Sequence, residues 1–132
     1  YVKVHPEFRV IFTSNSLEYA GVHRAQDALL DRMAGIYMDY YDRETETKII
    51  SQQAKIELKQ ASIITGMLGT LREKLPEGNS LGTRAGIMVA QALKLTDNFD
   101  ESSIKQMLGD VLTSKTKNLQ HFNEQMKIVR KL

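Results

Sequence analysis

The sequence predicts a mainly α-helical protein, in which a bundle of three or four helices follows a short α/β segment with one or two strands. Two observations lead to this fold class. Apolar residues recur every three or four positions through most of residues 44–132, which is the period of an amphipathic helix. Ahead of them, the run FRVIF at residues 8–12 is rich in aromatic and β-branched residues, which favours a buried strand. We therefore divide the chain into an α/β unit at residues 1–43 and a helical unit at residues 44–132.

In the first unit, the predicted strand at residues 8–12 is followed directly by the polar residues TSN at 13–15. Small polar side chains at the carboxyl end of a parallel strand lie where open α/β sheets bind their ligands. A short helix is expected from about residue 24 to residue 33. The aromatic and apolar run at residues 36–41 is typical of a last short strand in the same sheet.

A long amphipathic helix is expected to open the second unit, from Thr45 to about Leu75. Gly66 and Gly69 lie within it, and each weakens a helix by about 1 kcal/mol relative to alanine. They mark either a break or a close helix crossing, and the PEGN sequence at residues 76–79 then predicts a loop. The apolar stripe of this helix is Ile50, Ala54, Leu58, Ala61, Ile64, Leu68, Leu71 and Leu75.

Shorter helices are expected after this loop. The first begins between Ser80 and Thr83, either of which has a side chain suited to an N-cap. Asp100 or Ser102 is expected to cap the next helix, and a last helix is expected from about Ser114.

The composition excludes several classes of protein. The net charge of the 132 residues is only +2, which gives no reason to expect a nucleic-acid or membrane partner. Cysteine is absent, so disulfides and thiolate metal sites are excluded. His5, His23 and His121 have no histidine four residues away, so no helical zinc site is expected. No apolar run approaches the ~18 residues of a membrane-spanning helix.

Three stretches resemble MoxR-type AAA+ ATPases, and within them most closely the gas vesicle protein N (GvpN) family. HPEFRVIFTSN at residues 5–15 is similar to the sensor-1 region, EYAGVHRAQDALLDR at 18–32 to the arginine-finger region, and LGTRAGIMVAQAL at 81–93 to the sensor-2 helix. One departure is Ser16, where many relatives carry proline. The chain also has no G-x-x-x-x-G-K-[ST] phosphate-binding loop, which we expect to lie before Tyr1 in a longer ATPase.

The resemblance assigns catalytic roles to two residues. Asn15 would orient the attacking water, because its amide both donates and accepts hydrogen bonds. The alternative is a turn asparagine that bonds its own backbone. Arg32 would be the arginine finger, which reaches the nucleotide of a neighbouring subunit and stabilises charge on the transferred phosphoryl group. Arg24 is the alternative finger, and a surface arginine paired with Asp31 is the alternative role for Arg32.

The resemblance assigns nucleotide binding to a third residue, Arg84. It is expected in the first turn of its helix, where the helix dipole already favours phosphate and a cation adds to that preference. As a sensor-2 arginine it would make the position of the helical lid depend on the bound nucleotide. The alternative is an arginine that contacts solvent or a nearby carboxylate.

The resemblance implies that the full-length protein is an ATPase that couples ATP binding and hydrolysis to remodelling or assembly in gas vesicle formation. Its cofactors would be ATP and Mg²⁺. Its partners would be gas vesicle proteins and other copies of itself in a hexameric ring, in the cytoplasm and associated with gas vesicles. Neither nucleic-acid binding nor membrane insertion is expected, and the 132 residues alone are expected to bind no cofactor and to hydrolyse nothing. The alternative is a non-catalytic interaction module, in which residues 44–132 bind a partner helix in an apolar groove.

Overall fold

The computed structural model describes residues 2–13, 31–75, 81–114, 116 and 118–132, which fall into two units, Tyr1–Tyr37 and Met38–Leu132. Residues 2–13 and 31–42 contain neither helix nor strand, so the strands predicted at 8–12 and 36–41 are not present in them. A strand is stable only when its N–H and C=O groups pair with a neighbouring strand, and the described residues supply no such neighbour. The helix expected at residues 24–33 lies mostly outside the described residues, and Asp31 and Arg32 form a turn.

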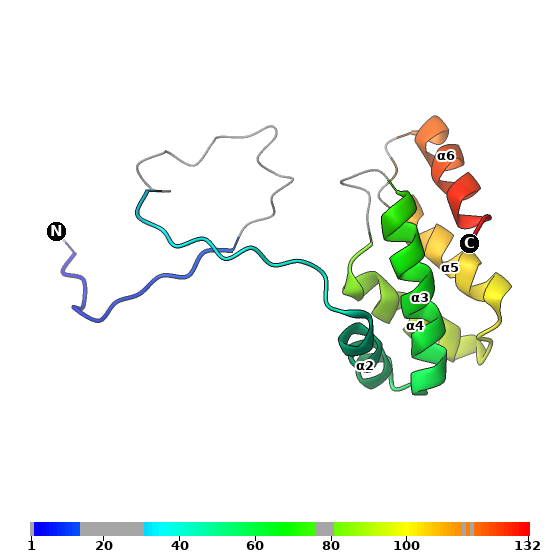
Figure 1. Cartoon of the computed structure of the whole chain (residues 1–132), viewed down its shortest axis with the longest axis horizontal. Helices are drawn as coiled ribbons and strands as arrows, with labels where there is room; N and C mark the ends of the chain where they lie inside the picture. The colour runs from blue at the N-terminus through cyan, green and yellow to red at the C-terminus, as the bar shows by residue number, and fades with distance from the viewer. Residues whose placement is uncertain (1, 14–30, 76–80, 115, 117) are drawn as a thin grey trace. The chain divides into compact units, whose positions relative to one another are not determined.

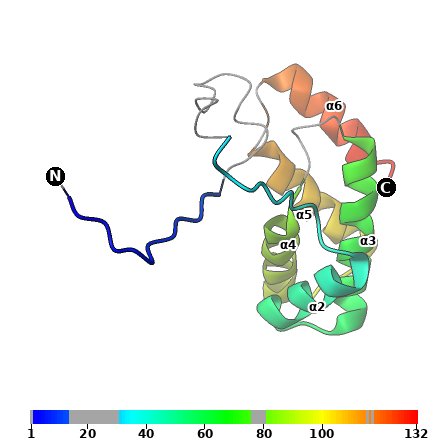
Figure 2. The same ribbon diagram turned by 60° about the vertical axis from the view of Figure 1, so that its left-hand side comes forward.

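The second unit is helical, as the period of its apolar residues predicts (Figure 1). The described residues form five helices, which are α2 (Arg43–Ala54), α3 (Leu58–Lys74), α4 (Thr83–Thr96), α5 (Glu101–Thr113) and α6 (Leu119–Val129). Helix α2 packs on α3 and α4, α4 packs on α5, and α6 packs on α5 and α3. Figure 2 shows the same bundle from the side, with α2 across one end and α6 at the other.

The apolar stripes meet in one core. Its fully buried large side chains come from all five helices and from the segment before α4, and they are Ile50, Ile64, Leu68, Leu71, Leu81, Val89, Leu93, Ile104, Leu108, Leu112 and Val129. Most of the stripe predicted for residues 50–75 is therefore buried. Leu58 is the exception, because it is the first residue of α3 and its side chain is 57% exposed.

The single long helix predicted from Thr45 to Leu75 is wrong, because the chain breaks it into α2 and α3 at Lys55. Lys55 adopts the left-handed conformation, with φ 56° and ψ 54°. The hydroxyl of Ser51 donates to the carbonyl oxygen of Ile56 at 2.7 Å, which satisfies one backbone group at the break. Gln60 Oε1 then accepts from the backbone N–H of Glu57 at 3.0 Å and starts α3. Gly66 and Gly69, the predicted break points, lie inside α3.

A glycine in α4 allows the close helix crossing in this bundle. A Cβ atom on Gly86 would lie 2.6 Å from Ile50 Cδ1 and 2.6 Å from Leu68 Cδ1. These two side chains belong to α2 and α3, so α4 approaches both helices at the level of Gly86. A larger residue fits there only if the Ile50 and Leu68 side chains or the helices shift.

The helix caps match the sequence in part. Asp42 Oδ1 accepts from the backbone N–H of Thr45 at 2.9 Å, and this hydrogen bond is the main reason that the pKa of Asp42 is lowered. Asp100 caps α5 as predicted, and the hydrogen bond from the Ser103 N–H likewise lowers its pKa. The last helix begins at Leu119 with Asn118 as its cap, later than the predicted start near Ser114.

Candidate functional site

The candidate site is the beginning of α4, where the sequence places Arg84. Arg84 is the second residue of this helix, and its side chain is exposed. The N-cap is Gly82 rather than the predicted serine or threonine, so no side chain of the cap occupies the N–H groups of the first turn. An arginine at the positive end of a helix dipole is a chemically suitable arrangement for phosphate.

A buried ion pair lies at the base of this helix start. Glu46, in the first turn of α2, is 1% exposed, although most carboxylates remain in water. Its partner is Arg72 in the last turn of α3, which donates from Nη1 to Glu46 Oε2 at 2.8 Å and from Nη2 to Oε1 at 2.7 Å. Two parallel bonds of this kind form the strongest geometry that an arginine and a carboxylate adopt.

The same two side chains hold both sides of the α4 cap. Arg72 Nε donates to the carbonyl oxygen of Leu81 at 2.7 Å. The hydroxyl of Thr83 donates to Glu46 Oε1, also at 2.7 Å. Leu81 and Thr83 flank the N-cap Gly82, so charge-assisted hydrogen bonds hold a backbone carbonyl on one side of the cap and a side-chain hydroxyl on the other, immediately before Arg84.

An aromatic ring completes the surroundings of Arg72. Its guanidinium carbon lies 4.0 Å from the centre of the Tyr40 ring, a distance at which the cation is attracted to the ring face. Tyr40 precedes α2, so the arginine joins the segment leading into the bundle to the start of α4. The side chain of Arg72 is only 12% exposed, and its N–H groups are engaged by Glu46 and Leu81.

The other predicted site residues lie elsewhere or outside the described residues. Arg32 is in the turn at residues 31–32, in the unit Tyr1–Tyr37, whereas Arg84 belongs to the unit Met38–Leu132. Asn15 and Arg24, the sensor-1 asparagine and the alternative finger, lie outside the described residues.

Sequence reasoning missed Glu46 and Arg72, and it named Thr83 only as an alternative N-cap, although the pattern held a signal for the first two. Glu46 continues the buried stripe of α2 at a spacing of four ahead of Ile50, and Arg72 follows Leu68 at the same spacing in α3. A charge in register with an apolar stripe indicates a buried partner. Thr83 has no such local signal, because its hydroxyl faces a residue 37 positions away.

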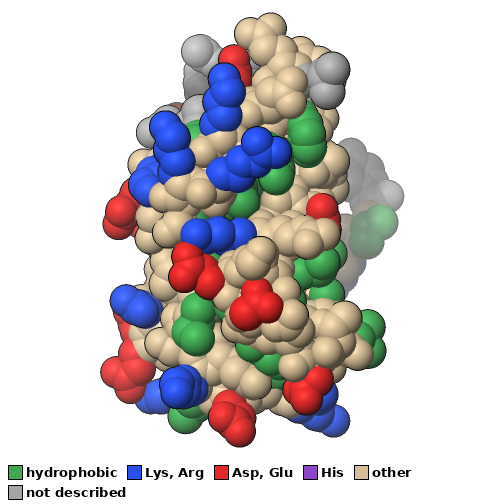
Figure 3. All heavy atoms as spheres, turned by 90° about the vertical axis from the view of Figure 1, so that its right-hand side faces the viewer, with side chains coloured by type: hydrophobic (Ala, Val, Ile, Leu, Met, Phe, Trp, Pro, Cys, Tyr) green, Lys and Arg blue, Asp and Glu red, His purple; other side chains and the backbone are tan. Residues whose placement is uncertain are grey.

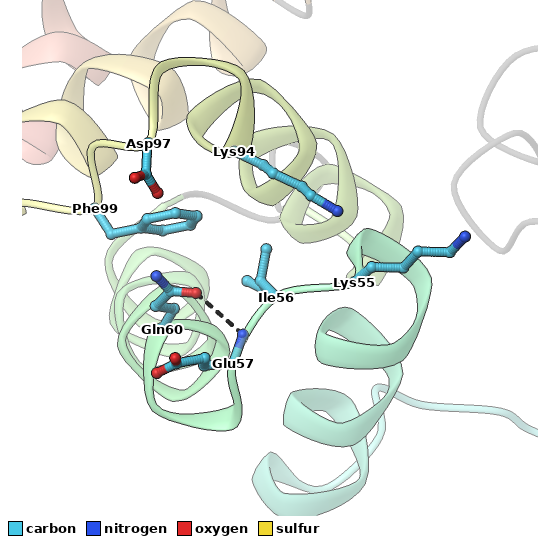
Figure 4. A pocket seen from close by; sticks show the side chains of 7 residues that line it. All are labelled: Lys55, Ile56, Glu57, Gln60, Lys94, Asp97 and Phe99. Atoms are coloured by element: carbon cyan, nitrogen blue, oxygen red, sulfur yellow. Dashed lines mark hydrogen bonds between the residues drawn. The ribbon is translucent and has the colours of Figure 1, made fainter.

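A hollow elsewhere in the bundle has a lining of mixed charge. It is shallow, with a volume of about 380 Å³, and Figure 4 shows it between the connection of α2 to α3 and the end of α4. Lys55 and Lys94 stand on one side and Glu57 and Asp97 on the other, around the apolar Ile56 and Phe99. Lys94 already donates to the carbonyl oxygen of Ala54 at 3.3 Å. The charges of this hollow therefore do not converge on one kind of ligand.

The described residues form neither a metal cluster nor a membrane-spanning helix. Among the described residues, no three His, Asp or Glu side chains lie together as a metal site would require. The helices of the described part are all too short or too polar to cross a bilayer. On the face drawn in Figure 3, lysines and arginines gather mainly in the upper part, most acidic side chains lie below them, and hydrophobic side chains show in between.

The described part thus defines a class of protein: a mainly helical domain in which the start of α4 carries an exposed arginine and is held by a buried ion pair. The chain is homologous to the gas vesicle ATPases GvpN, as the resemblance in its sequence predicted.

It is 50% identical to the gas vesicle ATPase GvpN2 of Halobacterium salinarum over 115 residues and 48% identical to GvpN of Haloferax mediterranei over 116 residues. It is 39% identical to GvpN of Ancylobacter aquaticus over 118 residues. Each match covers 87% of this chain and 33% of the relative, so the chain spans about a third of the length of these proteins. No family model matches the chain, and neither does any solved structure.

Proposed function

We propose that this chain is the C-terminal part of an AAA+ ATPase, comprising the end of its α/β core and its helical lid, and that the whole enzyme uses ATP hydrolysis in gas vesicle formation. The observation that carries the proposal is the identity of 39–50% to proteins named gas vesicle ATPase, over 87% of this chain. The exposed Arg84 in the first turn of α4 supports it, because a lid arginine must reach the nucleotide from a fixed backbone.

In this proposal, each of the three predicted residues acts on a different part of the reaction. Arg84 binds the phosphates of the nucleotide held by its own subunit, and Asn15 orients the attacking water through its amide. Arg32 reaches the nucleotide of the neighbouring subunit in a hexameric ring and stabilises charge on the phosphoryl group. Mg²⁺, when bound with ATP, neutralises phosphate charge, and the residues that hold it would be outside this chain, as would the phosphate-binding loop.

The test is ATP turnover by the complete ATPase that contains this chain. Arg32→Ala is expected to lower kcat by about 10³-fold or more, since arginine fingers contribute that much in related reactions. Arg84→Ala is expected to weaken ATP binding by about tenfold or more, because it removes hydrogen bonds to a charged group.

The matched control is Arg130→Ala, which removes an exposed arginine after α6. Its turnover and its affinity for ATP are expected to equal those of the unmodified enzyme. If neither Arg32→Ala nor Arg84→Ala differs from this control, the ATPase assignment of the site fails, and the non-catalytic interaction module becomes the better account.

A further inference from the structure

The beginning of α4 lacks the usual local means of fixing a helix start. Its N-cap is glycine, which has no side chain to accept a hydrogen bond from the first turn. Steric crowding does not require this glycine, because nothing lies within 4 Å of a Cβ placed on Gly82. The direction in which the first turn points therefore depends on tertiary contacts.

Those contacts come from Glu46 and Arg72. Arg72 binds the carbonyl oxygen on one side of the cap, and Glu46 binds the hydroxyl of Thr83 on the other. Both side chains are held by their own bidentate pair, and Glu46 is fully buried. A buried, doubly bonded pair has one arrangement, whereas an exposed pair has several, so this pair fixes the positions of the Leu81 carbonyl and the Thr83 hydroxyl that it binds.

We propose that Glu46, Arg72 and Thr83 are positioning residues for Arg84, and that they set the direction in which its guanidinium meets the phosphates of the nucleotide. The inference rests on the proposed function of Arg84. Thr83 precedes Arg84 directly, so a change in the orientation of its peptide is passed to the next residue without any intervening contact.

The stacking of Tyr40 on Arg72 links the positioning of the α4 start to the segment that precedes α2. Tyr40 lies two residues before the α2 cap Asp42, and its ring is 4.0 Å from the guanidinium carbon of Arg72. Movement of this segment is therefore transmitted to the start of α4 through one side chain. Arg72 in this way connects the segment before α2, which contains Tyr40, with Glu46 and with the start of α4 that carries Arg84.

The test is a double-mutant cycle between Thr83→Val and Arg84→Ala in the complete ATPase, with the affinity for methylanthraniloyl-ATP as the readout. Valine keeps the branched shape of threonine and loses only the hydroxyl that binds Glu46. We expect Thr83→Val to weaken binding by about threefold or more when Arg84 is present, and to have no further effect in the Arg84→Ala background. Thr83→Ser keeps the hydroxyl and is expected to restore most of the affinity.

The matched control is Thr65→Val, because the hydroxyl of Thr65 is also buried in this unit. It donates to the Ala61 carbonyl oxygen in α3 and accepts from the Thr47 hydroxyl of α2, so neither bond involves α4. Thr65→Val is expected to leave the affinity unchanged in both backgrounds. Equal losses from Thr83→Val with and without Arg84, or an equal loss from Thr65→Val, would overturn the positioning role while leaving the function of Arg84 intact. No loss from Arg84→Ala alone would overturn that function, and the positioning role with it.

Discussion

Replacing Glu46 by glutamine is expected to destabilise the helical unit strongly. The carboxylate accepts three hydrogen bonds, two from Arg72 and one from Thr83, and it is 1% exposed. Glutamine retains one acceptor oxygen and turns an N–H₂ group toward the guanidinium, so Arg72 stays buried with a neutral, partly repelling partner.

The expected loss of stability in Glu46→Gln follows from the burial of this ion pair. Removing one partner of a buried ion pair costs about 3–5 kcal/mol, and the retained amide oxygen of glutamine places Glu46→Gln at the lower end, about 3 kcal/mol. In a unit of this size, each kcal/mol shifts the unfolding midpoint by about 4–8 °C, so a fall in Tm of more than about 10 °C is expected. Helical circular dichroism during thermal and urea unfolding measures both quantities.

Glu44→Gln is the matched control. Glu44 lies in the same first turn of α2, but it pairs with Lys48 at 2.6 Å on the surface, where the two side chains are 78% and 60% exposed. Exposed pairs of this kind contribute little because solvent screens them. If Glu46→Gln lowers the midpoint no more than Glu44→Gln does, the buried pair does not hold the bundle as we have argued.

The remaining predictions concern packing and pH. Gly86→Ala is expected to cost about 1–3 kcal/mol in urea unfolding, because the new Cβ would lie 2.6 Å from Ile50 Cδ1, and a midpoint equal to that of the unmodified chain would contradict the close crossing. Gly69→Ala, where nothing lies within 4 Å, is expected to stabilise by about 1 kcal/mol, the difference in helix propensity. The lowered pKa values of Asp42 and Asp100 mean that their stabilisation is complete above about pH 4 and is lost as the pH falls through the folded-state values, below 3.8. Replacing both by asparagine, which still caps a helix, should therefore reduce the fall in Tm between about pH 4 and pH 2, and an unchanged fall would exclude the two caps as its cause.

Local patterns in the sequence predicted the helices of the second unit well where the residues that determine a feature are close together in the sequence. The stripe through Ile64, Leu68 and Leu71 is buried, and Asp100 caps α5. Each of these features depends on residues at most four positions apart, which is the range over which helical periodicity and capping act.

The break between α2 and α3 was not predictable in the same way. No glycine or proline stands at Lys55, and a lysine with positive φ is uncommon. The conformation is stable because contacts around it compensate, such as the hydrogen bond from Ser51 to Ile56 and the burial of Ala54. The glycines that seemed to mark the break instead lie within α3.

The sequence by itself determined that the chain is mainly helical, which residues form the main apolar stripe, and that Arg84 stands in the first turn of a helix. Only the tertiary structure decided what holds that turn, because Glu46 and Arg72 are 26 positions apart and Glu46 and Thr83 are 37 apart. A charged side chain is stable in the interior only opposite its partner, and the partner comes from another helix. Helical periodicity extends over only a few residues. It therefore tells on which side of its own helix a charged residue lies, but not which other helix will pack against that side.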